Sequence, residues 1–317
     1  MTSDNRSDSK LLWLGAGLIT AGFLANTVQG ALGKLAQISI APGQFLWLLL
    51  LFALGVLVPA ALWKSTSTSE TTEKRSITEV LKAGWKRQIF PFYLLRAVFG
   101  LCGFYLFIWA AGLGNLVDAT VLLNTTPIFI PLIGITLLDK EISIALWGAI
   151  ALGFIGLLLV VQPNVALLKN PANLLGLGAG ASAAIEFLTV RWLSRTQSPL
   201  GQTLYYLMIG AVGMTPIALL QWRPIDLDTF KLIAAAAGCF LTFQLLLVKA
   251  YSFAEPHQIG VFQYSSVIFA AVIGWLFFDE LPNRTALVGM MLISGGGGLS
   301  IYLEQRPQQS LPVESTP

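Results

Sequence analysis

Ten apolar stretches, each about as long as a bilayer-spanning helix, follow one another along the 317-residue sequence. A transmembrane helix needs about 20 mainly apolar residues to cross the hydrocarbon core. The stretches occupy residues 11–33, 42–63, 89–111, 116–137, 143–161, 172–193, 203–222, 232–253, 257–278 and 285–303. Mean hydropathy is +0.73 and 11% of the residues are charged, against roughly 25% in soluble domains. The sequence therefore predicts an all-α integral membrane protein with ten transmembrane helices.

The longest connection, residues 64–88, is rich in Lys and Arg, whereas the other connections are short. Cytoplasmic loops of membrane proteins carry an excess of these residues, so this loop is predicted to be cytoplasmic. Counting spans from it places both tails, residues 1–10 and 304–317, in the cytoplasm, and we expect a multi-pass protein of a bacterial cytoplasmic (inner) membrane. Within the loop, residues 76–87 predict a short amphipathic helix on the inner membrane surface.

An internal repeat relates the two halves of the chain. The segment AAGLGNLVDATVLLNTTPIFIPLIGITLLDKE (110–141) aligns with KAYSFAEPHQIGVFQYSSVIFAAVIGWLFFDE (249–280), which places Asn124 opposite Gln263, 139 residues later. After these segments, small residues match at equal spacing: Gly148, Gly153 and Gly156 with Gly289, Ser294 and Gly297. The chain is therefore predicted to be a duplication.

Each predicted repeat, residues 11–161 and 172–303, holds five apolar stretches. Because five is odd, the two repeats enter the membrane in opposite senses. Inverted repeats of this kind are typical of secondary transporters, in which one part rocks against the other around a central site and gives alternating access. A duplicated helical bundle without a transport role is the alternative.

Several segments resemble a known family. "LDKE" at 138–141 and "FFDE" at 277–280 each end a helix and precede a Gly-rich helix, which is similar to the two EamA repeats of the drug/metabolite transporter superfamily. The segments LLNTTPIFIPL and LRAVFGLCGFYLFIWAAGLG resemble that family as well. The resemblance implies a gradient-driven or facilitative transporter of small polar organic metabolites, with efflux of amino-acid-like compounds as the first expectation. Some relatives import S-adenosylmethionine or riboflavin, so uptake of a nucleoside-like or vitamin-like cofactor is the alternative.

Polar groups within a bilayer turn toward a cavity or another helix, because lipid cannot satisfy them. In the fourth stretch Thr120, Asn124, Pro127, Pro131 and Gly134 are spaced by three or four residues and share one helical face. Each proline frees a backbone carbonyl one turn earlier. We expect this face, with its freed carbonyls, to border a solute path; a kinked packing helix is the alternative.

Amides and phenols in other stretches extend the set of candidate path residues. They are Asn26 and Gln29 in the first stretch, Tyr105 in the third, Gln244 and Tyr251 in the eighth, and Gln263 and Tyr264 in the ninth. Such groups suit a polar organic solute, and each could equally well serve as a contact between helices. Together Tyr105, Tyr205, Tyr251 and Tyr264 predict an aromatic cavity, which favours the nucleoside-like alternative.

Two charged residues, Arg96 and Glu186, lie within predicted spans at a similar depth from the inner surface. Charges inside a membrane are rare and mark ion pairs or functional sites. Arg96 and Glu186 are expected either to pair with each other or to act separately, with Arg96 as the anchor of a substrate carboxylate and Glu186 as a proton-coupling acid. In the second case protons are the coupling ion.

Composition and motifs argue against several other classes of protein. The chain has one histidine, no HExxH pattern and no intramembrane Asp pair, so an enzyme is not expected. Its glycine clusters are not followed by Lys and Ser or Thr, which excludes a phosphate loop. The net charge is only +3 and no basic stripe occurs, so nucleic acid is not an expected partner. We expect a small-molecule substrate and the lipid bilayer as partners, no cofactor, no metal, and a monomer or homodimer.

Overall fold

The computed structural model describes residues 4–36, 39–67, 86–113, 121–138, 143–162, 173–278 and 283–304. These ranges are helical apart from caps and short turns, and they contain no β-strand, in agreement with the predicted all-α class. Three features of the sequence analysis lie outside them: Thr120, the acidic ends of the LDKE and FFDE segments (139–141 and 279–280), and most of the surface helix predicted over residues 76–87.

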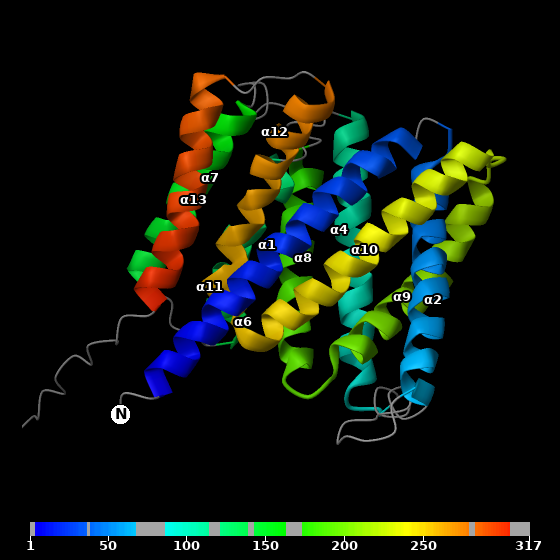
Figure 1. Cartoon of the computed structure of the whole chain (residues 1–317), viewed down its shortest axis with the longest axis horizontal. Helices are drawn as coiled ribbons and strands as arrows, with labels where there is room; N and C mark the ends of the chain where they lie inside the picture. Colours follow the sequence, from blue (N-terminus) through cyan, green and yellow to red (C-terminus); the bar gives the residue numbers. More distant parts are fainter. Residues whose placement is uncertain are drawn as a thin grey trace, which may run out of the picture.

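Figure 1 shows the helices in the order of the chain. They are α1 (Asp4–Ala36), α2 (Pro42–Ser67), α4 (Phe90–Leu113), α6 (Thr126–Leu138), α7 (Ile144–Val161), α8 (Asn173–Ser194), α9 (Pro199–Leu220), α10 (Leu227–Phe253), α11 (Pro256–Ile259), α12 (Ser265–Phe278) and α13 (Arg284–Glu304). A 3-10 segment, η2 (Gly260–Tyr264), joins α11 to α12.

Eight of the described helices are long and apolar enough to cross a bilayer, namely α1, α2, α4, α7, α8, α9, α10 and α13. The protein is therefore an integral, multi-pass membrane protein. The fourth and ninth predicted stretches hold shorter helices, because the chain turns at Asn124 and Thr125 before α6 and passes through η2 before α12. With 13 and 14 residues, α6 and α12 are about 20 Å long, short of the roughly 30 Å of the hydrocarbon core.

Helices α9 and α10 begin before the apolar windows predicted for them, because polar side chains cap their first turns. Ser198 Oγ accepts a hydrogen bond from Gly201 N (3.2 Å), and Asp226 Oδ1 accepts one from Thr229 N (3.3 Å). Such caps satisfy amides that have no partner within the helix. Hydropathy marks only the part of a helix that lies in lipid, so it misses these polar ends.

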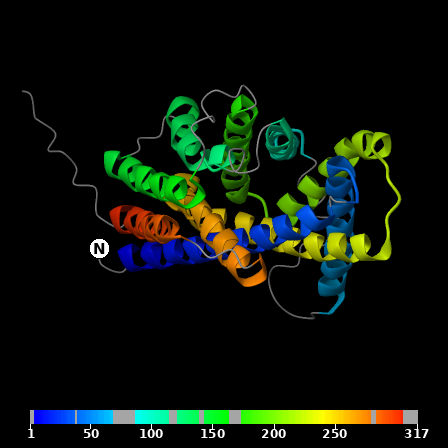
Figure 2. The ribbon, with the colours of Figure 1, turned by 90° about the horizontal axis from the view of Figure 1, so that it is seen from above.

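Helices that are distant in sequence pair along their lengths: α1 with α10, α4 with α8, α2 with α9, and α7 with α13. Figures 1 and 2 show the α7–α13 pair at one end of the molecule and the α2–α9 pair at the other, with the remaining two pairs between them. Large apolar side chains such as Trp63, Val212 and Leu220 are exposed on the surface of the bundle, as expected where lipid is the solvent.

Glycines bring α7 and α13 into close contact. A Cβ atom on Gly156 would lie 2.6 Å from the Gly289 carbonyl oxygen, and one on Gly296 would lie 3.0 Å from the Ala149 carbonyl oxygen. A shift of 140 positions takes Ala149 to Gly289 and Gly156 to Gly296, so the two contacts are reciprocal. The sequence alignment matched Gly148, and not Ala149, with Gly289, and so differs from the contacts by one position. The alignment pairs identical residues, whereas close helix packing requires only a small residue at the contact.

Candidate functional site

A cavity of about 180 Å³ lies among the central helices. Its lining comes from α1, α2, α4, α8, α9 and α10, together with the turn before α6, the break that precedes α12 and the first turn of α12. Six of the residues predicted for a solute path line it: Asn26, Gln29, Asn124, Glu186, Gln244 and Gln263. The cavity thus brings together polar side chains from both halves of the sequence.

The other five predicted path residues are not part of the lining: Arg96, Tyr105, Pro127, Tyr251 and Tyr264. The Tyr105 hydroxyl packs against α2, where it would lie 2.7 Å from a Cβ atom on Gly43. Tyr264 packs against Phe154 of α7, with ring centroids 6.4 Å apart. These tyrosines therefore contribute to contacts between helices.

Phenylalanines, and not the predicted tyrosines, supply most of the aromatic lining. The aromatic residues that line the cavity are Phe23, Phe104, Phe107, Phe187, Tyr206, Phe240 and Phe243. The sequence has 19 phenylalanines, and hydropathy cannot distinguish a ring that faces lipid from one that faces a cavity. One signal was present: helical spacing places Phe23 on the face of Asn26, and Phe240 on the face of Gln244.

Glu186 on α8 is the one acidic residue among the described residues that line the cavity. Its side chain is 8% exposed, and it makes no hydrogen bond or ion pair with the described residues. Gly100 on α4 leaves room for the carboxylate, because a Cβ atom there would lie 2.8 Å from Glu186 Oε2. Within the described ranges no group of three His, Cys, Asp or Glu residues could hold a metal ion.

Arg96 on α4 is fully buried and lies behind the cavity wall. Its Nη1 donates to Gln202 Oε1 (3.3 Å) and its Nη2 to Gln244 Oε1 (2.9 Å), while its guanidinium carbon lies 5.1 Å from the centroid of the Tyr206 ring. The ion pairs of the described residues do not include one between Arg96 and Glu186. Of the groups that Arg96 contacts here, Gln244 and Tyr206 line the cavity.

The turn before α6 gives the cavity the side chain of Asn124. Asn124 is 4% exposed and lines the cavity, whereas Pro127 is buried outside the lining. The Leu123 carbonyl, which was expected to be left free by Pro127, accepts a hydrogen bond from the Thr126 hydroxyl (2.6 Å). The Leu123 carbonyl is thus satisfied locally by a threonine, and Asn124 supplies a polar group to the lining.

Three rings close one side of the cavity and are called the phenylalanine layer below: Phe23 of α1, Phe187 of α8 and Phe243 of α10. The Phe23 ring centroid lies 6.4 Å from that of Phe187 and 5.4 Å from that of Phe243. Phe187 in turn packs against the fully buried Tyr251, with ring centroids 5.6 Å apart. The three rings and Tyr251 belong to one buried apolar cluster, and along α8 and α10 members of this cluster lie between the last residues that line the cavity and the ends of both helices.

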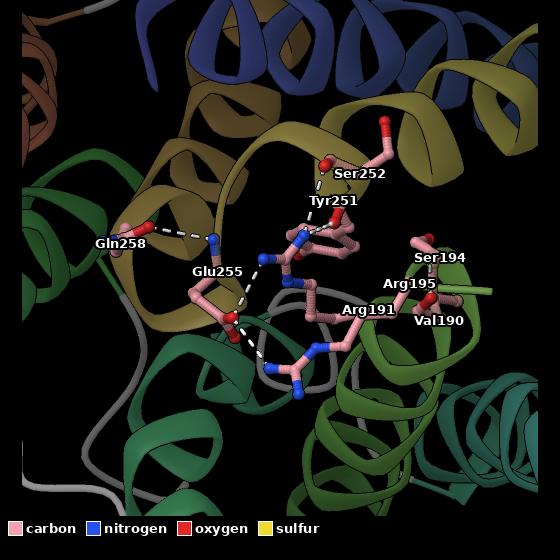
Figure 3. A network of polar contacts seen from close by, with 8 residues as sticks. All are labelled: Val190, Arg191, Ser194, Arg195, Tyr251, Ser252, Glu255 and Gln258. Carbon is pink, nitrogen blue, oxygen red and sulfur yellow. Dashed lines mark hydrogen bonds and ion pairs between the residues drawn. The ribbon is translucent and has the colours of Figure 1, made fainter. Parts of the chain in front are cut away.

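Beyond this layer, Arg191, Arg195 and Glu255 form an ionic cluster called the end network below (Figure 3). Glu255 Oε1 lies 3.0 Å from Arg191 Nη2 and 3.1 Å from Arg195 Nη2. Arg191 Nη1 also donates to the backbone carbonyls of Tyr251 (2.7 Å) and Ser252 (3.2 Å), which lie in the last turn of α10. The end network therefore fastens the end of α8 to the end of α10 and the start of α11.

Three known transporters are similar to the chain in sequence. The pseudopaline exporter CntI of Pseudomonas aeruginosa is 26% identical over 65% of this chain and 73% of its own. The riboflavin transporter of Vibrio cholerae is 27% identical over 67% and 72%, and the S-adenosylmethionine uptake transporter of Rickettsia prowazekii is 23% identical over 69% and 75%. A crystal structure of a protein that is 16% identical superposes with a TM-score of 0.69 over 94% of this chain and 97% of its own, which shows a shared fold.

The sequence model of one family matches nearly the whole chain. The model of the EamA-like transporter family matches residues 10–162 and, a second time, residues 170–302. The similar proteins named above are likewise transporters and not enzymes. The chain therefore belongs to the EamA-like transporter family of the drug/metabolite transporter superfamily.

Proposed function

We propose that the protein is a secondary transporter that exports small polar, amino-acid-like metabolites across a bacterial cytoplasmic membrane by alternating access. The observation that carries this proposal is the central cavity, into which amides project from both halves of the chain. Amides offer donors and acceptors at once, which suits a polar organic solute. The similarity to the pseudopaline exporter supports efflux as the direction. We also propose that one chain forms one complete site, so that a monomer is sufficient for transport and a homodimer would carry two sites.

We further propose ten membrane-crossing segments in two inverted repeats, in which broken helices form the fourth and ninth crossings. Two observations support this arrangement. Helix α6 begins at Thr126 and α12 begins at Ser265, 139 residues later. Asn124 and Gln263, which precede these starts by two residues, both line the cavity. Interrupted helices at matching positions of two repeats mark the substrate site in many transporters.

The helix pairs also support a two-fold relation between the proposed repeats, residues 11–161 and 172–303. Under that relation the α1–α10 pair becomes equivalent to the α8–α4 pair, and the α2–α9 and α7–α13 pairs each map onto themselves. The reciprocal glycine contacts between α7 and α13 fit the same relation. With five crossings in each repeat and the basic loop 64–88 inside, we place both tails in the cytoplasm.

In this orientation the end network lies at the cytoplasmic end, because α8 and α10 both end there. The cavity is on the other side of the phenylalanine layer from the end network. Solute from the cytoplasm would enter only after the layer parts and Arg191 and Arg195 release Glu255. We therefore propose that the layer and the end network form the cytoplasmic gate, with Glu186, the acid in the cavity, as the group that couples transport to protons.

Metabolite profiling and counterflow test the proposal. Comparison of cells with and without the protein identifies solutes whose levels depend on it, and counterflow in proteoliposomes then measures their flux through the purified protein. We expect saturable exchange that is lost in the double variant Asn124→Leu, Gln263→Leu. Thr242→Val, which removes a polar group from an exposed position of α10, is the matched control and keeps its flux. Absence of flux for every metabolite that responds in cells would contradict the proposal.

A second candidate function is uptake of a nucleoside-like or vitamin-like cofactor, and the ring-rich lining favours it. Aromatic walls stack well on a flat heterocycle. The similarity to a riboflavin transporter and to an S-adenosylmethionine uptake transporter points in the same direction. Counterflow of labelled riboflavin and labelled S-adenosylmethionine decides between the two candidates, since exchange of either at low concentration supports uptake.

A further inference from the structure

We propose that the cavity selects solutes with a positively charged nitrogen, which pairs with Glu186, on an apolar or aromatic body that lies against the phenylalanine rings. This inference rests on the proposed transport function and adds the charge and shape of the substrate. Three features of the lining carry it: the sign of its charge, the availability of the carboxylate, and the position of the rings.

The cavity presents a negative charge to its contents. Among the described lining residues Glu186 is the acid, and none is Lys, Arg or His. Arg96 reduces the negative potential from behind the wall, but it is fully buried and its Nη1 and Nη2 already donate to Gln202 and Gln244. A solute carboxylate would therefore find amides in the cavity and a repelling carboxylate, and not the Arg96 guanidinium.

The Glu186 carboxylate is available for a ligand. It is 8% exposed, lines the cavity, and makes no hydrogen bond or ion pair with the described residues. A carboxylate removed from water is strongly disfavoured unless a counter-charge and hydrogen bonds replace the lost hydration. An ammonium group supplies both, through short charge-assisted N–H···O bonds. Gly100 lets the carboxylate keep this position, because a Cβ atom there would lie 2.8 Å from Glu186 Oε2.

The rings line the same cavity as this carboxylate. Phe23 packs against both Phe187 and Phe243, which completes the phenylalanine layer. Ring faces attract organic cations and also bury apolar surface. The amides Asn124 and Gln263 remain for other polar groups of the solute. The site thus fits an organic ammonium compound, such as an amine or an amino-acid amide with an aromatic side chain.

Two probes with the same ring, a similar length and opposite charge test this inference. They are 2-phenylethylammonium and 3-phenylpropionate, titrated calorimetrically into the purified full-length protein in nanodiscs at pH 7. We expect the cation to bind at least tenfold more tightly than the anion. Glu186→Gln should abolish that preference, and Gly100→Ala should weaken cation binding at least tenfold with the carboxylate still present. Asp228→Asn makes the same acid-to-amide change at an exposed position of α10 and should keep the preference.

Equal or tighter binding of the anion by the unsubstituted protein would overturn the inference, as would binding of neither probe. The inference would also be overturned if the Glu186→Gln variant still bound 2-phenylethylammonium more tightly than 3-phenylpropionate, by the same factor as the wild type. If Glu186→Gln fails to fold, the comparison of the two probes on the unsubstituted protein and on Gly100→Ala decides. The proposed function fails separately, by an absence of flux in counterflow. Flux of a metabolite without a positive charge, at an undiminished rate in Glu186→Gln, would refute this inference alone.

Discussion

Replacing Glu255 by glutamine keeps the size of the side chain but removes the charge that Arg191 and Arg195 contact at 3.0 and 3.1 Å. The Arg195 side chain is 54% exposed, so its pair with Glu255 contributes only a few tenths of a kcal/mol. The side chains of Arg191 and Glu255 are 20% and 19% exposed, and a hydrogen-bonded charge pair in that setting contributes about 1–2 kcal/mol. We therefore expect Glu255→Gln to destabilise the closed cytoplasmic end by about 1–2 kcal/mol.

That loss raises the population open at this end by about 5- to 30-fold. The assay is the reaction of a maleimide with Val248→Cys in protein whose two native cysteines, Cys102 and Cys239, are replaced by alanine. Val248 is fully buried between the phenylalanine layer and the end network, so it reacts only after opening. When opening is fast relative to labelling, the labelling rate follows the open population.

The matched control is again Asp228→Asn, which breaks the exposed ion pair with Lys231 (2.9 Å) far along α10 from the end network. Its labelling rate should equal that of the parent protein. An unchanged rate in Glu255→Gln, with the melting temperature preserved, would show that the end network does not hold the gate closed.

Other positions give independent tests. Gly156→Ala places a methyl group 2.6 Å from the Gly289 carbonyl oxygen and should lower the free energy of unfolding by about 1–3 kcal/mol, measured as a lower melting temperature in detergent. The control is Gly148→Ala, whose methyl group meets no atom within 4 Å and should leave the melting temperature unchanged. Asn124→Leu removes one amide from the lining and should slow counterflow about 2- to 10-fold, which corresponds to the net free energy of one hydrogen bond to the solute. Flux at the wild-type rate would exclude Asn124 from the path. Hydrogen bonds from Thr229 lower the pKa of the Asp226 side chain, the cap of α10, below its usual 3.8. The stability that the charged cap contributes is therefore complete above pH 3.8 and is lost as the pH falls through the lower pKa of the folded state. The melting temperatures of the wild type and Asp226→Ala should converge at that low pH.

The sequence was sufficient to predict the helices and the amides of the cavity, for one physical reason. Lipid cannot satisfy polar groups, so each amide in an apolar stretch has few places to go. The internal repeat places Asn124 opposite Gln263, and both amides line the cavity. The break of the helix at Asn124 was not predicted, because the hydrogen bond from Thr126 to the Leu123 carbonyl depends on local backbone geometry that hydropathy does not report.

Tyrosines were harder to place than amides. A phenol has one polar atom on a large apolar ring, so packing can outweigh the loss of a hydrogen bond. The hydroxyls of Tyr105, Tyr251 and Tyr264 are buried without a hydrogen-bond partner in the part of the chain that the structure describes. Arg96 shows another limit: its depth could be read from the sequence, but its partners lie 106 and 148 residues away, on helices whose rotation no single stretch reveals.

The partners of Arg96 have a consequence for biosynthesis. Gln202 and Gln244 emerge from the ribosome long after Arg96, since they lie 106 and 148 residues later in the chain. Until then, the nascent third segment carries Arg96 into the bilayer without these two amides, at an insertion penalty below the roughly 2.5–3.5 kcal/mol of an arginine at the centre of a helix. A truncated chain that stops after the first repeat keeps Arg96 and never receives either amide. We therefore expect the first half alone to leave the translocon poorly, because Arg96 finds these two hydrogen-bond partners only after the second half has been made.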